Sequence, residues 1–300
     1  MLGIITGSSG FVGQNILMSH YFKEKFSFIS YKRNANLPDN VSFDNCKFIL
    51  HLAGKAHDLK NNSNPQSYYD ANTTLTKNLF DKFLTSNSEV FIFMSSVKAV
   101  ADELNAELFE DFTPKPLTDY GKSKHHAEQY ILSKSISKFK RVYILRPCMI
   151  HGVGNKGNLN LLYKIVSKGF PWPLGSFENK RSFCSIQNLC FIIKELIENN
   201  QIPSGVYNIA DDNPVSTNEL VKLISQILDK KLLIWNIPKT IILWLFQIGD
   251  LLKLPFNTER LYKLTETYIV SNNKIKNAIN KPLPIDSREG LIKTFNSFKH

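Results

Sequence analysis

The first half of the chain alternates short apolar runs with stretches in which apolar residues recur every three or four positions. The apolar runs are rich in Ile, Leu, Val and Phe without polar alternation, which is typical of strands buried on both faces of a parallel sheet. They fall at residues 2–6, 26–31, 47–52, 89–95 and 141–146, and helices are predicted between them at about 12–23, 69–86 and 120–135. This order predicts an α/β fold with a Rossmann-type, doubly wound parallel sheet. Between residues 31 and 47 there is little room for a helix and a strand, so part of the usual crossover is expected to be missing.

The pattern changes beyond about residue 155. Loop residues dominate 154–158 and 171–175, helices are predicted at 186–199, 217–228 and 240–252, and a strand at 206–210. We therefore predict a dinucleotide-binding domain at residues 1–155, on which a later segment at about 186–210 packs. Residues 156–300 are predicted to form mainly a smaller α/β lobe that binds the substrate.

The most apolar stretch of the chain is residues 240–248, TIILWLFQI. Because a helix needs about 20 apolar residues to cross a bilayer, stable membrane insertion is not expected. A buried helix is the favoured interpretation and a membrane-surface helix is the alternative. The chain reaches a glycine-rich turn by Gly7 without the leader of a secreted protein, so a cytoplasmic location is predicted.

The amino-acid composition narrows the possible functions only a little. The chain is 43% hydrophobic with a formal net charge of +11. Its lysines are scattered and form no dense basic tract, so no nucleic-acid partner is expected, although a positive field would attract an anionic cofactor or substrate. The four cysteines lack CxxC spacing and are interpreted as reduced core thiols, without a metal site: Cys46, Cys148, Cys184 and Cys190.

A glycine-rich turn joins the first predicted strand to the first helix. The spacing GxxGxxG at residues 7–13 lets the backbone approach a pyrophosphate, and the helix that follows offers unpaired N–H groups. A structural turn is the alternative, but this position favours dinucleotide binding. An enzyme that prefers NAD usually carries a carboxylate after the second strand. Here Lys32 and Arg33 stand there, and they would attract a 2′-phosphate, so NADP(H) is favoured over NAD(H).

Tyr120 and Lys124 lie four residues apart on one face of a predicted helix. A nearby ammonium favours phenolate, so Lys124 is expected to lower the pKa of Tyr120 from its usual value of about 10. Such a phenol suits general acid–base chemistry between alcohol and ketone. Ser96 follows the strand predicted at 89–95, where ligand sites form in parallel sheets.

Together these motifs resemble the extended short-chain dehydrogenase/reductases, also called the NAD-dependent epimerase/dehydratase family. Further matches are His51 to Gly54, Asn72, Ser95-Ser96, Arg146-Pro147, Asn158, Arg181 to Phe183 and Ser271 to Ile275. The resemblance implies that Ser96, Tyr120 and Lys124 are catalytic and that Asn72 anchors the site. It implies substrate contacts at Ser96, Lys98, Asn158 and Arg181, and dinucleotide contacts at Gly7, Ser9, Gly10, Phe11, Val12, Gly13, Lys32, Arg33, Leu52, Ala53, Gly54, Tyr120, Lys124 and Pro147.

The resemblance also implies a nucleotide-diphosphate sugar as substrate, UDP-linked by preference, and a homodimer. The sequence departs from the family pattern at His151-Gly152-Val153, where Tyr-Gly-Pro is common. His151 could contact substrate, but an ordinary loop histidine is the favoured interpretation. The aspartate that relatives place near the adenine is not identifiable.

Three reactions share this machinery. A dehydratase needs additional acid and base groups, and relatives with that activity usually carry an acidic residue directly after the serine. Val97 stands at that position here, so dehydration is disfavoured. Segments 95–100, 170–175 and 181–183 resemble bacterial polysaccharide enzymes that reduce a UDP-2-acetamido-2,6-dideoxy-4-keto-hexose to UDP-N-acetylquinovosamine. We therefore favour a 4-ketoreductase or 4-dehydrogenase, with a UDP-sugar 4-epimerase as the alternative. A non-catalytic dinucleotide-binding protein is less favoured, because a binder has no use for a tuned phenol.

Overall fold

The computed structural model describes residues 1–31, 43–55, 64–155, 157–254 and 257–299. Its main feature is a six-stranded sheet in the order β2-β1-β3-β4-β5-β8, in which all neighbouring strands are parallel. The strands are β1 (Leu2–Thr6), β2 (Ser27–Tyr31), β3 (Phe48–His51), β4 (Val90–Met94), β5 (Arg141–Pro147) and β8 (Gly205–Ile209). The fold prediction is confirmed. The crossover expected to be incomplete falls largely on residues 32–42 and lies outside the described part.

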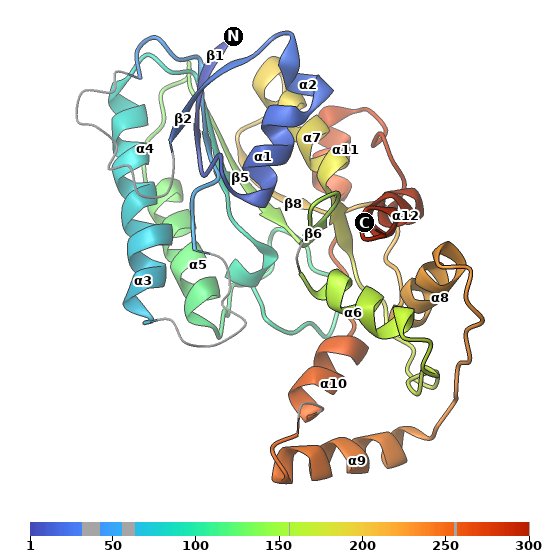
Figure 1. The fold of residues 1–300 in the computed structure, drawn as a ribbon. Coiled ribbons are helices and arrows are strands. Elements are labelled where there is room, and N and C mark those ends of the chain that lie inside the picture. The colour runs from blue at the N-terminus through green and yellow to red at the C-terminus, as the bar shows by residue number, and fades with distance from the viewer. Residues whose placement is uncertain (32–42, 56–63, 156, 255–256, 300) are drawn as a thin grey trace.

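Consecutive strand residues point to opposite faces and are buried on both. Ile4 belongs to the core on one face and Ile5 to the core on the other. Helices cover both faces (Figure 1): α1 (Phe11–Met18), α2 (His20–Lys23), α7 (Ile186–Glu198) and α11 (Asn273–Ile279) on one, and α3 (Gln66–Tyr69), α4 (Leu75–Thr85) and α5 (Asp119–Leu132) on the other. A π-helical turn, η1 (Asp70–Thr74), joins α3 to α4. The helix predicted at 69–86 is therefore a composite of three elements.

The remaining elements gather beyond the ends of the strands (Figure 1). They are the 3-10 turn η2 (Val97–Ala99), the parallel pair β6 (Met149–His151) and β7 (Phe183–Ser185), and the helices α6 (Asn158–Ser167), α8 (Thr217–Ile227), α9 (Lys239–Leu251), α10 (Thr258–Thr265) and α12 (Ser287–Asn296). A separate core unites residues of α6, α8 and α12, including Leu162, Val221 and Phe295. We keep the division near residue 155 as a proposal, which this separate core supports.

The helix predicted at residues 240–248 is present, but the prediction that it is buried is wrong. The helix is present as α9, but its buried residues are Ile242 and Gly249, whereas Trp244 is 60% and Leu251 82% exposed. The reason is that α9 packs beside α10 at the periphery, away from the sheet (Figure 1). In the part of the chain that the structure describes, no helix is both long and apolar enough to cross a membrane.

Candidate active site

The glycine turn lies at the carboxyl end of β1, the strand between β2 and β3. Gly7 has a φ of +72°, and a Cβ there would come within 2.7 Å of the Ala53 backbone nitrogen, so only glycine fits between β1 and the segment after β3. Gly10 caps α1 without a side-chain acceptor for the first helical N–H groups. Ser9 and Gly10 are exposed, Phe11 and Val12 half-buried and Gly13 buried. This cradle fits a dinucleotide pyrophosphate.

The segment after β3 forms the other side of this cradle. Leu52, Ala53 and Gly54 follow the end of β3, and Asn72 fixes the next residue, because its Oδ1 accepts from the Lys55 N–H at 2.8 Å. The Asn72 amide also donates to the Ser123 hydroxyl at 2.9 Å, and Asn72 is fully buried in the π-helical turn. Asn72 thus ties the segment after β3 to α5. Lys32 and Arg33 lie outside the described residues.

The α5 helix begins close against the loop after β4. Thr118 caps it by accepting from the Gly121 N–H at 3.2 Å. A Cβ on Gly121 would lie 2.3 Å from the Lys98 carbonyl oxygen, so this glycine permits the contact between α5 and η2. The contact brings the Tyr120 phenol into a hydrogen bond with the Ser96 hydroxyl. Residues 24 positions apart in sequence thereby meet at one edge of the sheet.

Lys124 lies one helical turn beyond Tyr120, buried beneath the same edge. Its ammonium donates to the Met94 carbonyl oxygen at 2.7 Å and lies 4.8 Å from the centre of the Phe93 ring. Burial lowers the pKa of Lys124 to about 8, and Glu128 opposes the shift. The structure therefore places Ser96, Tyr120 and Lys124 together.

The expected lowering of the Tyr120 pKa is not found. Burial raises the pKa of Tyr120, and the hydrogen bond to Ser96 only partly opposes that shift. The Lys124 ammonium faces the Met94 carbonyl and the Phe93 ring instead of stabilising a phenolate. Tyr120 is consequently held as a neutral phenol, the form that donates a proton.

Charged residues meet beyond Ser96, where a substrate would lie. The Lys98 ammonium donates to the Asp102 carbonyl at 2.7 Å and lies 4.4 Å from the centre of the Tyr268 ring. Arg181 pairs with Glu266 at 2.9 Å and donates to the Lys263 carbonyl. Burial raises the pKa of Glu266, and Arg181 and Lys98 oppose the shift. Glu266 and Tyr268 were not predicted from the sequence, because no local motif marks them.

The predicted substrate contact Asn158 and the predicted cofactor contact Pro147 make none of the interactions described so far. Asn158 is exposed and opens α6, and Pro147 is buried at the end of β5. The interpretation of His151 as a loop residue is wrong: it is fully buried in β6, 2.9 Å from the Thr294 hydroxyl and 3.3 Å from a carboxylate oxygen of Asp211. His151 therefore joins β6 to α12 and does not face a substrate.

The His51 side chain is buried at the end of β3 beneath the glycine turn. Its ring nitrogens lie 2.7 Å from the Thr6 hydroxyl and 2.9 Å from the Thr76 hydroxyl. Thr6 in turn accepts from the Ala53 N–H at 3.1 Å. Burial, aided by the charge of Lys124, lowers the pKa of His51 to about 3.

We expect His51 to make stability fall in acid. The folded pKa of about 3 lies below the ordinary value of 6.5, so the unfolded chain binds the proton first as the pH drops. The free energy of unfolding should fall by about 1.4 kcal/mol per pH unit as the pH drops from 6.5 to about 3, where the folded state binds the proton as well. Urea unfolding of the wild type and His51→Asn should show a flatter pH dependence in the variant. Equal slopes, or the same flattening in the exposed His20→Asn control, would contradict this expectation.

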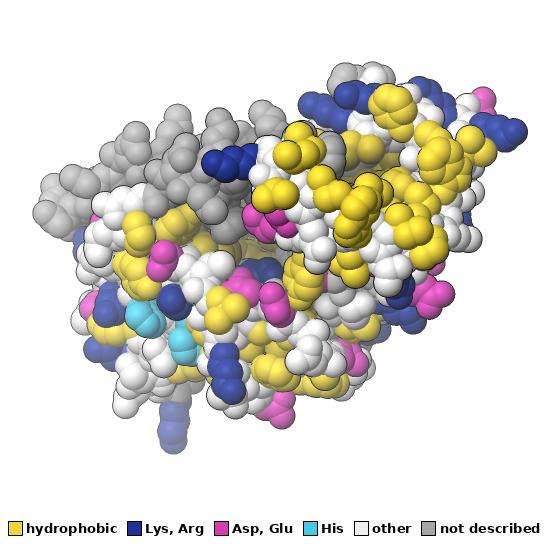
Figure 2. Space-filling view, turned by 90° about the horizontal axis from the view of Figure 1, so that it is seen from below, with side chains coloured by type: hydrophobic (Ala, Val, Ile, Leu, Met, Phe, Trp, Pro, Cys, Tyr) yellow, Lys and Arg dark blue, Asp and Glu magenta, His cyan; other side chains and the backbone are white. Residues whose placement is uncertain are grey.

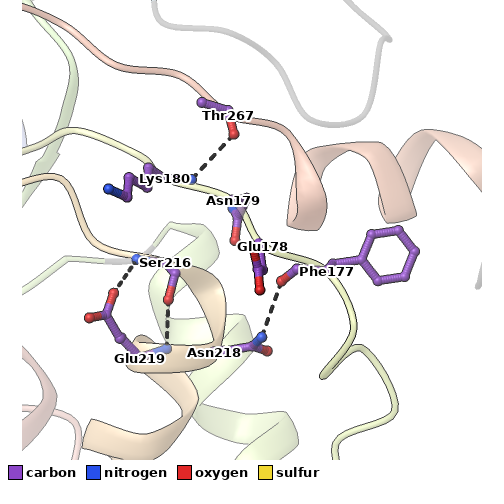
Figure 3. A pocket seen from close by; sticks show the side chains of 8 residues that line it. All are labelled: Phe177, Glu178, Asn179, Lys180, Ser216, Asn218, Glu219 and Thr267. Carbon is purple, nitrogen blue, oxygen red and sulfur yellow. Dashed lines mark hydrogen bonds between the residues drawn. The ribbon is translucent and has the colours of Figure 1, made fainter. Parts of the chain in front are cut away.

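The cavity drawn in Figure 3 lies elsewhere in the C-terminal part of the chain. It has a volume of about 550 Å³ and is lined by Phe177, Glu178, Asn179, Lys180, Ser216, Asn218, Glu219 and Thr267. Ser216 and Glu219 form the capping box of α8, in which the side chain of each accepts from the backbone N–H of the other (Figure 3). The Asn179 amide donates to the Thr217 hydroxyl. The cavity includes none of the predicted catalytic residues, so we assign the site from Ser96, Tyr120 and Lys124.

Comparison with known proteins identifies the family. The model of the NAD dependent epimerase/dehydratase family matches residues 4–210, more than half of the chain. The chain belongs to this family. As a member of the NAD dependent epimerase/dehydratase family, it is an enzyme of the short-chain dehydrogenase/reductase type that binds a nicotinamide dinucleotide.

Individual members of the family show how far the likeness extends. A UDP-glucose 4-epimerase of Vibrio cholerae is 31% identical over 98% of this chain and 94% of its own length. The N-acetyl-alpha-D-glucosaminyl-diphospho-ditrans,octacis-undecaprenol 4-epimerase of Escherichia coli O157:H7 is 29% identical over 78% of this chain and 75% of its own length. The crystal structure of UDP-N-acetylglucosamine 4-epimerase from Bacillus cereus superposes with a TM-score of 0.76 at 18% identity, covering 100% of both chains. The last likeness shows the fold.

Proposed function

We propose that this protein interconverts a hydroxyl and a ketone at C4 of a UDP-linked sugar. The observation that carries the proposal is the hydrogen bond between Tyr120 and Ser96, one helical turn from the buried Lys124. Tyr120 would exchange the proton of the C4 oxygen, and Ser96 would hydrogen-bond that oxygen. Lys124 would hold the nicotinamide ribose. The bound dinucleotide would supply or accept the hydride at C4.

The diphosphate of the substrate would bind at the charged cluster beyond Ser96. A guanidinium suits a double anion, so we assign this contact to Arg181. Asn158 and Lys98 would also contact the substrate. In the structure Arg181 pairs with Glu266. Substrate binding would therefore exchange one carboxylate partner of Arg181 for a diphosphate.

Net reduction is the first form of the reaction. Lys32 and Arg33 favour NADPH, and segments 95–100, 170–175 and 181–183 resemble ketoreductases of bacterial polysaccharide synthesis. The substrate would then be a UDP-2-acetamido-2,6-dideoxy-4-keto-hexose. We also propose that the enzyme acts in the cytoplasm as a homodimer.

Epimerisation at C4 is the second form. It is supported by the Vibrio relative, a UDP-glucose 4-epimerase that covers almost the whole chain. The Escherichia relative is a 4-epimerase named for a sugar linked through diphosphate to undecaprenol, so a lipid-linked sugar is a further candidate substrate.

A cofactor assay distinguishes the two forms. A ketoreductase should consume added NADPH when mixed with the UDP-4-keto sugar. An epimerase should interconvert UDP-glucose and UDP-galactose without added cofactor. Absence of both activities, together with absence of turnover of the lipid-linked sugar, would overturn the proposal.

The cofactor preference has its own test. Replacing Lys32 by Asp and Arg33 by Ala should raise the KM for NADPH by about 10-fold or more, because two charge-assisted contacts to the 2′-phosphate are lost. The KM for NADH should stay within about twofold, since NADH lacks that phosphate. An unchanged preference would show that these two cations do not select the cofactor.

A further inference from the structure

The α9 helix turns an apolar stripe toward solvent. Ile241, Trp244, Leu245, Leu251 and Leu252 recur at helical spacing and are 43 to 82% exposed. A surface helix ordinarily faces its apolar stripe toward the core. Here the buried positions, Ile242 and Gly249, form a different and narrower stripe. The exposed stripe is therefore not used by the fold.

The apolar surface extends beyond the helix. Leu233 and Trp235, just before α9, are about half exposed, and Trp235 is held by backbone hydrogen bonds to Trp172 and Gly175. Figure 2, which views the molecule from below, shows hydrophobic side chains gathered over the segment that holds α9. The Trp235 side chain is thus presented by a backbone that is hydrogen-bonded on both sides of the residue.

Charge identifies what would cover this surface. Residues 230–254 contain four lysines and one acidic residue, Asp250, a net charge of 4 − 1 = +3. Lys230, Lys231, Lys239 and Lys253 are all exposed. Lys239 opens α9 and Lys253 follows its end, whereas Lys230 and Lys231 precede Leu233 in the chain. Two of the three tryptophans of the chain, Trp235 and Trp244, are exposed here. Exposed Trp and Leu bordered by Lys is the composition of helices that lie in the interface of an anionic bilayer.

We propose that α9 docks this enzyme on the surface of a membrane that contains anionic lipids. The stripe would enter the boundary between headgroups and acyl chains, and the flanking lysines would contact the headgroups. A 13-residue helix is too short to cross the bilayer. A second copy of the chain fits less well, because pairing two α9 helices would bring the lysines at their ends together.

Docking would bring the charged residues beyond Ser96 close to the membrane. Leu243 of α9 lines a cavity of about 450 Å³ together with Leu261 and Tyr262 of α10 and Glu103, which follows the loop that carries Lys98. In Figure 2 a hollow bordered by charged side chains opens on the same face as the apolar surface. This arrangement would suit the lipid-linked substrate named under the proposed function. Membrane binding itself does not depend on which sugar is used.

The test is sedimentation of the full chain with vesicles of phosphatidylcholine alone or mixed equally with phosphatidylglycerol. We expect binding to the mixed vesicles, weakened by salt, with a blue shift of tryptophan emission. The double variant Trp244→Ser, Leu245→Ser should bind at least about tenfold more weakly. Phe139→Ser is the matched control, because Phe139 is an 88% exposed apolar residue outside α9. It lies two residues before the start of β5. Its binding should equal that of the wild type.

Three outcomes would overturn the docking proposal: no binding to either vesicle, equal loss of binding in the control, or a dimer that forms through α9 and dissociates in the double variant. The double variant should retain wild-type turnover of a water-soluble UDP-sugar, because neither residue belongs to the candidate site. Loss of membrane binding with retained turnover would support docking alone. Turnover failure in the wild type would count against the proposed function and leave the vesicle result unaffected.

Discussion

Replacing Tyr120 by Phe is expected to lower kcat by about 10²- to 10⁴-fold, the usual contribution of a positioned general acid or base. The change removes one oxygen from the only phenol that hydrogen-bonds Ser96 among the described residues. Because the ring remains, the packing of α5 should be kept. The measurement is steady-state turnover of the nucleotide sugar, with cofactor binding followed by fluorescence.

The pH dependence supplies a second readout for this residue. Since burial raises the pKa of Tyr120, the neutral phenol should dominate near pH 7 and support ketone reduction. Oxidation of the alcohol needs the phenolate and should speed up as the pH rises through that pKa. Both dependences should vanish in Tyr120→Phe. A variant that kept wild-type turnover would show that another group moves the proton.

Replacing Glu128 by Ala is expected to destabilise the protein by about 3–5 kcal/mol, because it leaves a buried guanidinium without its partner. Glu128 and Arg146 are 2.7 Å apart, and their side chains are only 1% and 5% exposed. Glu128 also accepts from the Ser95 hydroxyl, directly beside Ser96. Urea unfolding at pH 7 measures the loss.

The matched control removes both charges at once. Glu128→Leu combined with Arg146→Met should be much closer to the wild type than Glu128→Ala, because no charge is then left buried alone. If the double variant were as unstable as the single one, packing rather than charge would be the cause. A loss below about 1 kcal/mol in Glu128→Ala would place this pair in the range of exposed ion pairs and contradict the expectation.

The strands of the six-stranded sheet and the catalytic motif were predictable because both are local patterns. The runs of Ile, Leu and Phe in β1 and β4 place consecutive side chains on opposite faces, which requires cover on both sides. The GxxGxxG turn and the Tyr120–Lys124 spacing are also local, and a parallel sheet aligns the carboxyl ends of its strands. The meeting of Tyr120 with Ser96 follows from those patterns together. The short elements α10, α11 and α12 were not predicted, since about seven to ten residues give a weak periodic signal.

Other properties were decided only by the tertiary structure. The sequence determined that α9 is an apolar helix, that His51 lies in a short buried strand, and that Lys124 lies one turn from Tyr120. It did not determine that the stripe of α9 faces solvent, that His151 is sealed between β6 and α12, or that Lys124 turns to Met94. The physical reason is that periodicity reveals which residues share a face, whereas burial, ion pairing and pKa depend on what lies opposite that face. Those partners come from residues far away in the chain.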